Sequence, residues 1–258
     1  MDITQTFYDS MATQYDKLFS DWRATTHEQA VILDRIFRNN GFERTASVLD
    51  CACGIGTQSI GLAALGYPVT ASDISDGELA EAEKRAAENR VRIRFEHADF
   101  CALDRTFAQV FDIIICMDNA LPHMLSRDAL ASAIRSITGR LREGGIFVAS
   151  IRDYDALLLQ KPPYSPPYIH QTAAGQRVCF QTWTWEGEQY KLIQYIIDDG
   201  EKLEISKFEC AYRATRRAEL TDLLLASGCS EVNWLFPEKT DFYQPIVVAR
   251  KQNEEGTK

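Results

Sequence analysis

The first residues that could do chemistry lie in a glycine-rich turn, where Asp50 precedes Gly54 and Gly56. Glycines let a ligand approach the backbone, and the start of the following helix offers free N–H groups to an anion. Asp50 would attract an ammonium but repel a phosphate, and Ser59 replaces the third glycine of a pyrophosphate-binding turn. An amino acid therefore fits this turn better than a pyrophosphate. The alternative is a tight structural turn.

Two further acids follow short apolar runs. Asp73 is placed to accept two hydrogen bonds from a ribose diol. Asp99 offers an acceptor to an exocyclic amine, Phe100 offers an aromatic wall to a base, and Ile74 is able to cover its other face. Each acid alone is also a common helix N-cap. Their order and spacing predict a ligand that joins an amino acid to a nucleoside.

The segments that must position these residues alternate between strand and helix. Apolar strands are expected at 47–50, 68–73, 93–97, 111–117 and 146–151, with helices between them. Two later strands, at 232–236 and 244–250, complete the pattern. This alternation predicts an α/β fold with a doubly wound, mostly parallel, seven-stranded Rossmann-like sheet, which binds ligands beyond the carboxyl ends of its strands.

Two regions depart from this rhythm. Residues 1–40 show helical spacing in two stretches broken near 20–25, and we expect them to form an N-terminal helical cap. A proline-rich stretch begins at Lys161, and three aromatic and β-branched segments follow at 178–185, 189–197 and 202–212. They predict an antiparallel β-meander, inserted after strand five, that forms a lid over 161–212. The whole chain, 1–258, is expected to be a single domain.

The motifs VLDCACGIGT, ASDIS, HADF and FDIIICMDNALPHM occur in this order. With them the chain resembles the class I S-adenosylmethionine-dependent methyltransferases, and it is most similar to the glycine and sarcosine N-methyltransferase branch. The resemblance implies S-adenosylmethionine as cofactor and S-adenosylhomocysteine as product. It also implies an N-terminal segment whose aromatic residues fold over the cofactor. The expected cofactor-binding residues are Tyr8, Tyr15, Trp22, Asp50, Ala52, Gly54, Gly56, Asp73, Ile74, Asp99, Phe100, Met117 and Asn119.

Arg152 leaves the fifth strand at the ligand-binding edge of the sheet, where a guanidinium can bind a carboxylate with two hydrogen bonds. The resemblance implies that Arg152 and Tyr154 hold the carboxylate of the substrate. The alternative is an ion pair between Arg152 and a nearby acid: Asp153, Asp155 or Glu209.

The loop after strand four contains His123, a candidate general base because its unperturbed pKa lies near neutrality, although a single His after Pro also commonly orients a loop. Methyl transfer to an amine is an in-line displacement that depends mainly on alignment and desolvation. Trp183, Trp185 and Tyr195 are candidates to enclose a cationic amine, or are core residues of the meander.

Composition narrows the class of protein further. The formal net charge is −9 and there is no block of Lys or Arg, so the surface would repel nucleic acid. The apolar runs are shorter than a membrane span, and the first residues lack the pattern of a signal peptide. Seven scattered cysteines favour a reducing cytoplasm and no bound metal. The exposed edges of a meander allow a homodimer.

These features predict a cytoplasmic methyltransferase that acts on a small molecule, without a nucleic-acid or membrane partner. A nitrogen acceptor that carries a carboxylate, like glycine or sarcosine, is the first choice because of Arg152. An O-methyltransferase of a phenolic or other secondary metabolite, with His123 as base, is the alternative. A non-catalytic sensor of the cofactor is the alternative from another class.

Overall fold

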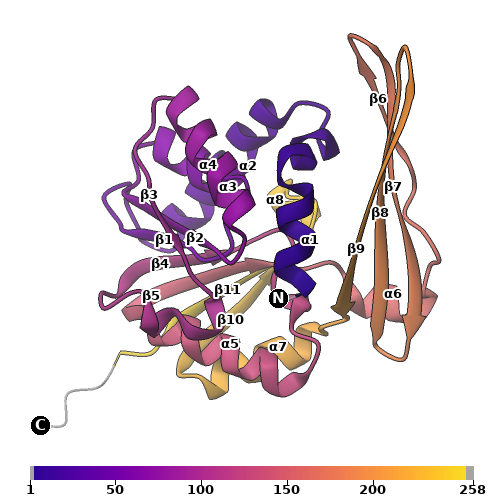
Figure 1. Cartoon of the computed structure of the whole chain (residues 1–258). Coiled ribbons are helices and arrows are strands. Elements are labelled where there is room, and N and C mark those ends of the chain that lie inside the picture. Colours follow the sequence, from indigo (N-terminus) through magenta and orange to yellow (C-terminus); the bar gives the residue numbers. More distant parts are fainter. Residues whose placement is uncertain (1–2, 254–258) are drawn as a thin grey trace, which may run out of the picture.

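A seven-stranded sheet forms the centre of the computed structural model, which describes residues 3–253 (Figure 1). Its strand order is β10-β11-β5-β4-β1-β2-β3. β11 pairs antiparallel with β5 and β10, and the other pairs are parallel, so the predicted doubly wound, mostly parallel sheet is confirmed. The strands are β1 (Val48–Asp50), β2 (Val69–Asp73), β3 (Arg94–His97), β4 (Phe111–Cys116), β5 (Leu141–Ser150), β10 (Cys229–Leu235) and β11 (Ile246–Lys251).

Helices cover both faces of this sheet (Figure 1). On one face lie α2 (Trp22–Asn39), α3 (Thr57–Ala64) and α4 (Asp76–Glu88), and on the other lie α5 (Arg127–Gly139) and α7 (Arg217–Ala226). Short turns of helix connect the remaining segments: η2 (Phe100–Arg105), η3 (Leu121–His123) and α8 (Pro237–Thr240).

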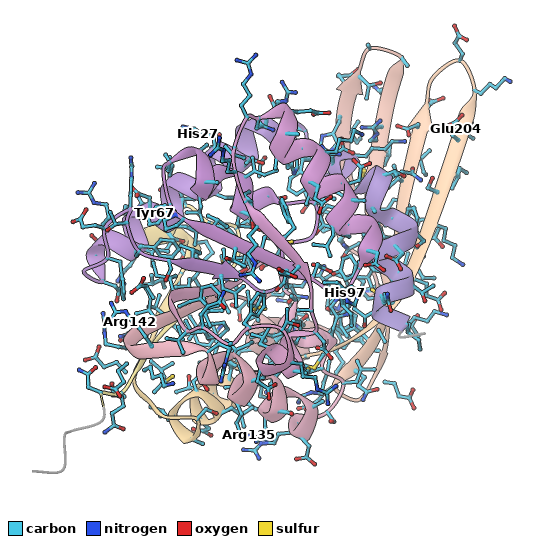
Figure 2. The ribbon with its side chains drawn as sticks, turned by 60° about the vertical axis from the view of Figure 1, so that its left-hand side comes forward. His27, Tyr67, His97, Arg135, Arg142 and Glu204 are labelled. Carbon is cyan, nitrogen blue, oxygen red and sulfur yellow. The ribbon has the colours of Figure 1, made fainter. Side chains whose placement is uncertain are left out.

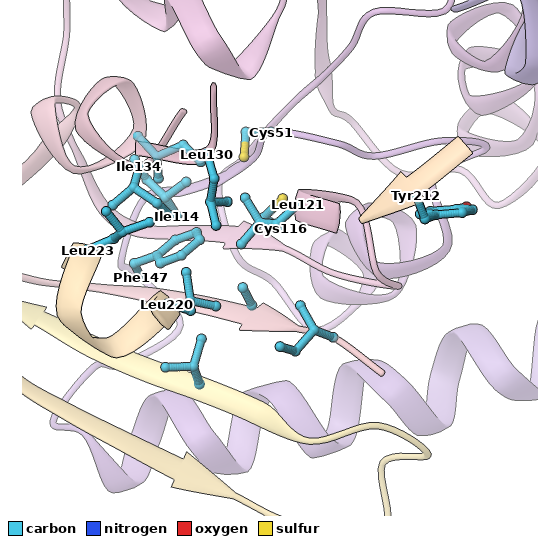
Figure 3. Close-up of a cluster of buried hydrophobic side chains, with 14 of the residues drawn as sticks. Cys51, Ile114, Cys116, Leu121, Leu130, Ile134, Phe147, Tyr212, Leu220 and Leu223 are labelled. Atoms are coloured by element: carbon cyan, nitrogen blue, oxygen red, sulfur yellow. The ribbon is translucent and has the colours of Figure 1, made fainter. Parts of the chain in front are cut away.

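The apolar run of β4 is continuous because each of its faces packs on a different hydrophobic cluster. Ile113 and Ile115 pack on the α2 side with Leu33. Ile114 packs on the other side, where Figure 3 shows it beside Phe147 and the helical leucines. Covering both faces removes the strand from water and leaves its carboxyl end as the accessible part.

A second sheet of four antiparallel strands stands beside the first, in the order β6-β7-β8-β9 (Figure 1). The predicted meander is therefore present, with an additional edge strand and a preceding helix that the sequence reading did not include. The elements are α6 (Tyr154–Gln160), β6 (Tyr168–Thr172), β7 (Gly175–Glu186), β8 (Gln189–Asp199) and β9 (Leu203–Arg213). Figure 2 shows Glu204 near the far end of this sheet, away from the strand ends of the main sheet.

The predicted N-terminal cap divides into two parts. α1 (Ile3–Met11) and η1 (Ala12–Leu18) contact α4, and α1 also contacts β9, whereas α2 packs in the layer over the main sheet. The break is shorter than expected, because the side chain of Asp21 accepts a hydrogen bond from the Ala24 N–H and starts α2 at Trp22.

All seven cysteines lie within the described residues, and none of them forms a disulfide there. Over residues 3–253, no three His, Cys, Asp or Glu side chains gather in an arrangement that would hold a metal ion. None of the helices in this range has the length and apolar character needed to cross a bilayer.

Candidate active site

The first cavity lies beyond the carboxyl ends of β1, β2, β3 and β4 and has a volume of about 290 Å³. We call it the cofactor cavity. Ten of the sequence-predicted residues line it together: Tyr8, Tyr15, Ala52, Gly54, Asp73, Ile74, Asp99, Phe100, Met117 and His123. Residues from strands far apart in the sequence meet here because parallel strands end at the same edge of a sheet.

Asp73 is fixed by backbone groups at the end of β2. Its Oδ2 accepts a hydrogen bond from the Gly54 N–H at 2.8 Å, and its Oδ1 accepts one from the Ser75 N–H at 3.0 Å. Burial raises the pKa of Asp73 above its usual value. The remaining lone pairs of this carboxyl can accept the two hydrogen bonds of a ribose diol.

At the end of β3, Asp99 caps the short helix η2, because its Oδ1 accepts a hydrogen bond from the Cys101 N–H at 2.8 Å. This local bond turns the chain so that both Asp99 and Phe100 line the cavity. Phe100 and Ile74 supply apolar walls for a planar ring.

Four predicted cofactor residues lie outside the lining of this cavity: Trp22, Asp50, Gly56 and Asn119. Asp50 is fully buried, and its Oδ2 accepts a hydrogen bond from Ser59 Oγ at 2.6 Å. Burial raises the pKa of Asp50 to about 7. The expectation that Asp50 meets a ligand ammonium is therefore corrected, because its side chain faces helix α3 instead of the cavity.

Gly56 and Trp22 act on the cavity indirectly. Gly56 has a left-handed φ of 87°, and a Cβ there would meet Ile60 Cδ1 at 3.0 Å, so this glycine allows the turn and the helix packing. Trp22 does not fold over the cavity: its indole N–H donates to Thr57 Oγ1 at 3.0 Å. It thereby holds Thr57, which does line the cavity.

A second, larger cavity of about 1110 Å³ lies between the main sheet and the antiparallel sheet. We call it the acceptor cavity. It shares Tyr8, Tyr15 and Asp118 with the cofactor cavity. These three residues therefore form the wall between the two.

Arg152 lines the acceptor cavity. Its guanidinium donates to Tyr190 Oη at 3.0 Å and to Gln181 Oε1 at 2.9 Å. It also lies over the ring of Trp183, with 5.0 Å between the guanidinium carbon and the ring centroid. These contacts fix its direction but involve no carboxylate. Within residues 3–253 the guanidinium has no acidic partner at ion-pair distance.

The acids that were candidates to neutralise Arg152 are taken by other cations. Asp153 and Asp155 pair with Arg217, at 2.5 and 3.2 Å. Glu209 pairs with Lys191 on the neighbouring strand. The ion-pair alternative for Arg152 is thus wrong, and its positive charge faces the cavity uncompensated.

Tyr154 is fully buried and lies outside the lining of both cavities. Its hydroxyl shares a hydrogen bond of 2.8 Å with Tyr190 Oη, which in turn accepts from Arg152. Tyr154 therefore positions Arg152 through Tyr190. Of the two residues predicted to hold a substrate carboxylate, only Arg152 lines a cavity, and its contact with a carboxylate stays a prediction.

His123 lines the cofactor cavity behind the shared wall. Its Nε2 lies 2.9 Å from Tyr8 Oη, and its ring lies 4.1 Å from that of Tyr212, between centroids. Burial raises the pKa of Tyr8 well above its usual value, so the phenol keeps its proton. This arrangement holds Tyr8 at the junction of the cavities.

The residue that the sequence reading missed is Asp118. Its Oδ2 accepts from Gln58 Nε2 and its Oδ1 from Tyr243 Oη, both at 2.8 Å. Asp118 and Asn119 both have left-handed backbones, with φ of 55° and 69°, and their N–H groups donate to the hydroxyl and the carbonyl of Ser150. Consecutive non-glycine residues in this region are strained, which is typical of functional loops.

Asn119 was predicted to contact the cofactor but lines the acceptor cavity. Its Oδ1 accepts a hydrogen bond from the Arg152 N–H at 3.1 Å, so it ties the strand-four loop to the end of β5.

The candidate aromatic enclosure is only partly present. Trp183 lines the acceptor cavity, and the cation over it is Arg152. Trp185 packs on Tyr190 at the edge of the hydrophobic core. Tyr195 stacks on Phe180 on the opposite face of the sheet, so it is no part of the site.

The cofactor cavity fits S-adenosylmethionine in its chemistry. Asp73 suits the ribose, Asp99 and Phe100 suit the adenine, and the wall with Asp118 suits a cationic group at the other end. Gly54, with φ of 51°, keeps the turn free of a side chain where the ligand passes.

Known proteins agree with this geometry. Residues 48–145 match the family described as methyltransferase domain. Glycine N-methyltransferase of Oryctolagus cuniculus is 32% identical over 244 residues, which cover 86% of this chain and 81% of that protein. Glycine/sarcosine N-methyltransferase of Parasynechococcus marenigrum is 30% identical over 154 residues, covering 60% of this chain. That match spans only 53% of the cyanobacterial protein, about half its length.

Among solved structures, an S-adenosylmethionine-dependent methyltransferase from Clostridium acetobutylicum is similar in fold, with a TM-score of 0.75 and 19% identity. The similarity covers 95% of this chain and 99% of that one. From its motifs, its strand-end cavity and its rabbit relative, the chain belongs to the class I S-adenosylmethionine-dependent methyltransferases.

Proposed function

We propose that this chain transfers a methyl group from S-adenosylmethionine to the amine nitrogen of a small acceptor that carries a carboxylate. The observation that carries the proposal is Arg152, which lines the acceptor cavity and whose guanidinium, among the described residues, donates to the neutral Tyr190 and Gln181 and has no acid at ion-pair distance. A desolvated charge without a partner is unfavourable, and a substrate carboxylate would supply that partner.

The nitrogen acceptor is supported by two independent points. Both named relatives are N-methyltransferases of glycine or sarcosine, which are amines with a carboxylate. The shared wall also presents the Asp118 carboxylate, which favours a group that is or becomes positively charged. A methylated amine becomes cationic, whereas a phenol would lose its proton.

When bound, the cofactor supplies an electrophilic methyl group on a sulfonium. The residues of this chain would then act by alignment and exclusion of water. Arg152 holds the far end of the acceptor, and Tyr8, fixed by His123, limits the path between the cavities. Asp118 Oδ1 and Oδ2 remain fixed by Tyr243 and Gln58, so their negative charge is already in place when positive charge develops on the amine.

The test is transfer of labelled methyl to glycine, sarcosine, other amino acids, phenethylamine and simple phenols, with wild type and Arg152→Gln. We expect labelled N-methyl amino acids, and a loss of about 100-fold in kcat/KM with Arg152→Gln, because a charge-assisted pair is lost. The dissociation constant of S-adenosylhomocysteine should change less than twofold.

Arg177→Gln is the matched control, since Arg177 lies on the same strand as Gln181 but pairs with Asp198. Equal kcat/KM for wild type and Arg152→Gln contradicts the carboxylate assignment. Label in a phenol points to the O-methyltransferase, and cofactor binding without any transfer points to the sensor.

We also infer a cytoplasmic location. None of the seven cysteines forms a disulfide among the described residues, even though Cys51 and Cys53 are only two positions apart, which suits a reducing compartment.

A further inference from the structure

The acceptor cavity is far larger than glycine requires. Glycine has five heavy atoms, which fill about 150 Å³ even at the roughly 30 Å³ that each water occupies in the liquid. The cavity measures about 1110 Å³ and opens to solvent past exposed lining residues such as Tyr164 and Tyr243. Most of this space would hold only water if glycine or sarcosine were the acceptor.

Much of the wall of this space is apolar. Hydrophobic side chains come from the N-terminal segment, from α6 and the proline stretch after it, from β7 and from the start of α8. They include Leu18, Phe19, Leu157, Pro162, Trp183 and Phe236. Contact between such walls and an apolar ligand is favourable in free energy, whereas their contact with water is unfavourable.

The proline-stretch wall is fixed in place and does not depend on a ligand. The Trp183 N–H donates to the Pro163 carbonyl at 2.8 Å, and the Ser165 N–H donates to the Gln181 carbonyl at 2.9 Å. The Trp185 indole N–H donates to the Pro162 carbonyl at 2.9 Å. These bonds attach the stretch to β7, and proline restricts its backbone further.

The opposite wall is fixed as well. Lys17 forms an ion pair of 2.8 Å with Asp198 at the end of β8, and Ser206 Oγ on β9 donates to Gln14 Oε1 at 3.0 Å. Both walls are therefore held apart by their own bonds to the antiparallel sheet.

We propose that the acceptor is an amino acid with a large apolar or aromatic side chain, whose carboxylate binds Arg152 and whose apolar body fills the cavity beside α6. This rests on the proposed N-methylation of a carboxylate-bearing amine. It narrows the substrate class, and it excludes glycine and sarcosine as the preferred acceptors in spite of the names of the relatives.

Ala156 offers a direct way to alter this space. It lies on α6 and lines the cavity at its exposed side, so a larger side chain there would narrow the space assigned to the apolar body. Its backbone N–H donates to Asp153 Oδ1, a bond that any residue other than proline keeps. Leu159, on the same helix, is 87% exposed and lies outside the lining, so Leu159→Trp is the matched control.

The experiment measures kcat/KM for glycine, leucine, phenylalanine and tryptophan with wild type, Ala156→Trp and Leu159→Trp. We expect wild type to prefer phenylalanine or tryptophan to glycine by 10- to 100-fold, as burial of one large apolar side chain implies. Ala156→Trp should lower the ratio of kcat/KM for phenylalanine to kcat/KM for glycine at least tenfold. Leu159→Trp should match wild type.

A wild type that prefers glycine, or an Ala156→Trp enzyme that affects glycine and phenylalanine equally, overturns this inference and leaves the proposed function standing. Label found only in phenethylamine or a phenol overturns the proposed function itself. Calorimetry of N-methylphenylalanine and sarcosine with the S-adenosylhomocysteine complex gives a second readout. Tighter binding of sarcosine would also contradict the inference.

Discussion

The cofactor cavity and the acceptor cavity share a wall but are built in different ways. Most residues that line the cofactor cavity lie within a few positions of the carboxyl ends of strands β1 to β4. The acceptor cavity takes its walls from five distant segments: 7–29, 118–119, 152–168, 181–212 and 236–245. The first is a consequence of strand order, and the second exists only after long-range packing.

The two cavities also differ in charge. Among the described residues, the cofactor cavity is lined by Asp73, Asp99 and Asp118 and by no Lys or Arg, whereas the acceptor cavity, which shares Asp118, is also lined by Arg152. Three aspartates that end strands, Asp50, Asp73 and Asp118, reach the cavities to different extents. Substituting each by asparagine therefore measures how far position at a strand end determines contact with a ligand.

Asp73→Asn should have the largest effect. The substitution removes the negative charge that would accept both ribose hydroxyls, so we expect the dissociation constant of S-adenosylhomocysteine to rise about 100-fold in calorimetry. The control is Asp76→Asn, three positions further along, where the carboxylate is 78% exposed. If Asp73→Asn binds S-adenosylhomocysteine as tightly as wild type, Asp73 does not contact the cofactor.

Asp118→Asn should have an intermediate effect on both cavities, because Asp118 lies on their shared wall. We expect about a tenfold rise in the cofactor dissociation constant and a similar rise in the acceptor KM, since one charge at a partly polar site is lost. Tyr243→Phe, which removes one of the hydrogen bonds to Asp118, should change each value less than threefold. A change confined to one ligand would place Asp118 in one cavity only.

Asp50→Asn should have the smallest effect on binding, within twofold for the cofactor, because Asp50 is sealed behind the turn. Its effect should appear in stability. The folded pKa of about 7 exceeds the unfolded value of about 3.9, so the folded state binds the proton more tightly. The stabilisation from the protonated form is present at low pH and is lost as pH rises toward 7.

Denaturant titrations between pH 5 and 8 check this sign. Relative to Asp50→Asn, which cannot titrate, the free energy of unfolding of wild type should fall by roughly 2–3 kcal/mol over this range. A difference between the two proteins that stays constant with pH would show that Asp50 has an ordinary pKa.

Local patterns were enough to predict the main sheet and much of the cofactor cavity. Asp73, Asp99 and Phe100 lie where strand ends place them, and the apolar run of β4 identifies a strand covered on both faces. Asp50 follows the same rule in sequence but turns its side chain toward Ser59 on α3. The direction of one side chain depends on the neighbouring helix, which strand spacing does not describe.

The acceptor cavity was less predictable for a physical reason. Arg152 lies at the sheet edge, as its place after β5 indicates. The acids near it in sequence form ion pairs with Arg217 and Lys191 of other elements, which the local pattern does not reveal. The edge strand β6 was not predicted, because it directly follows a proline-rich stretch. Prolines interrupt a central strand but are tolerated next to an edge strand. Nothing in the sequence pattern predicted Asp118 as a site residue except its position shortly after β4.

The bonds of the N-terminal segment also determine the order in which the molecule can be completed. Tyr8 contacts His123, Lys17 pairs with Asp198 and Gln14 accepts from Ser206, so contacts made by the first residues join partners 115 to 192 positions away. Contacts of such high sequence separation cost loop-closure entropy before they can form, which slows folding. During synthesis, the main sheet can begin to pair while the acceptor cavity is still open, and that cavity closes only after β9 has emerged from the ribosome.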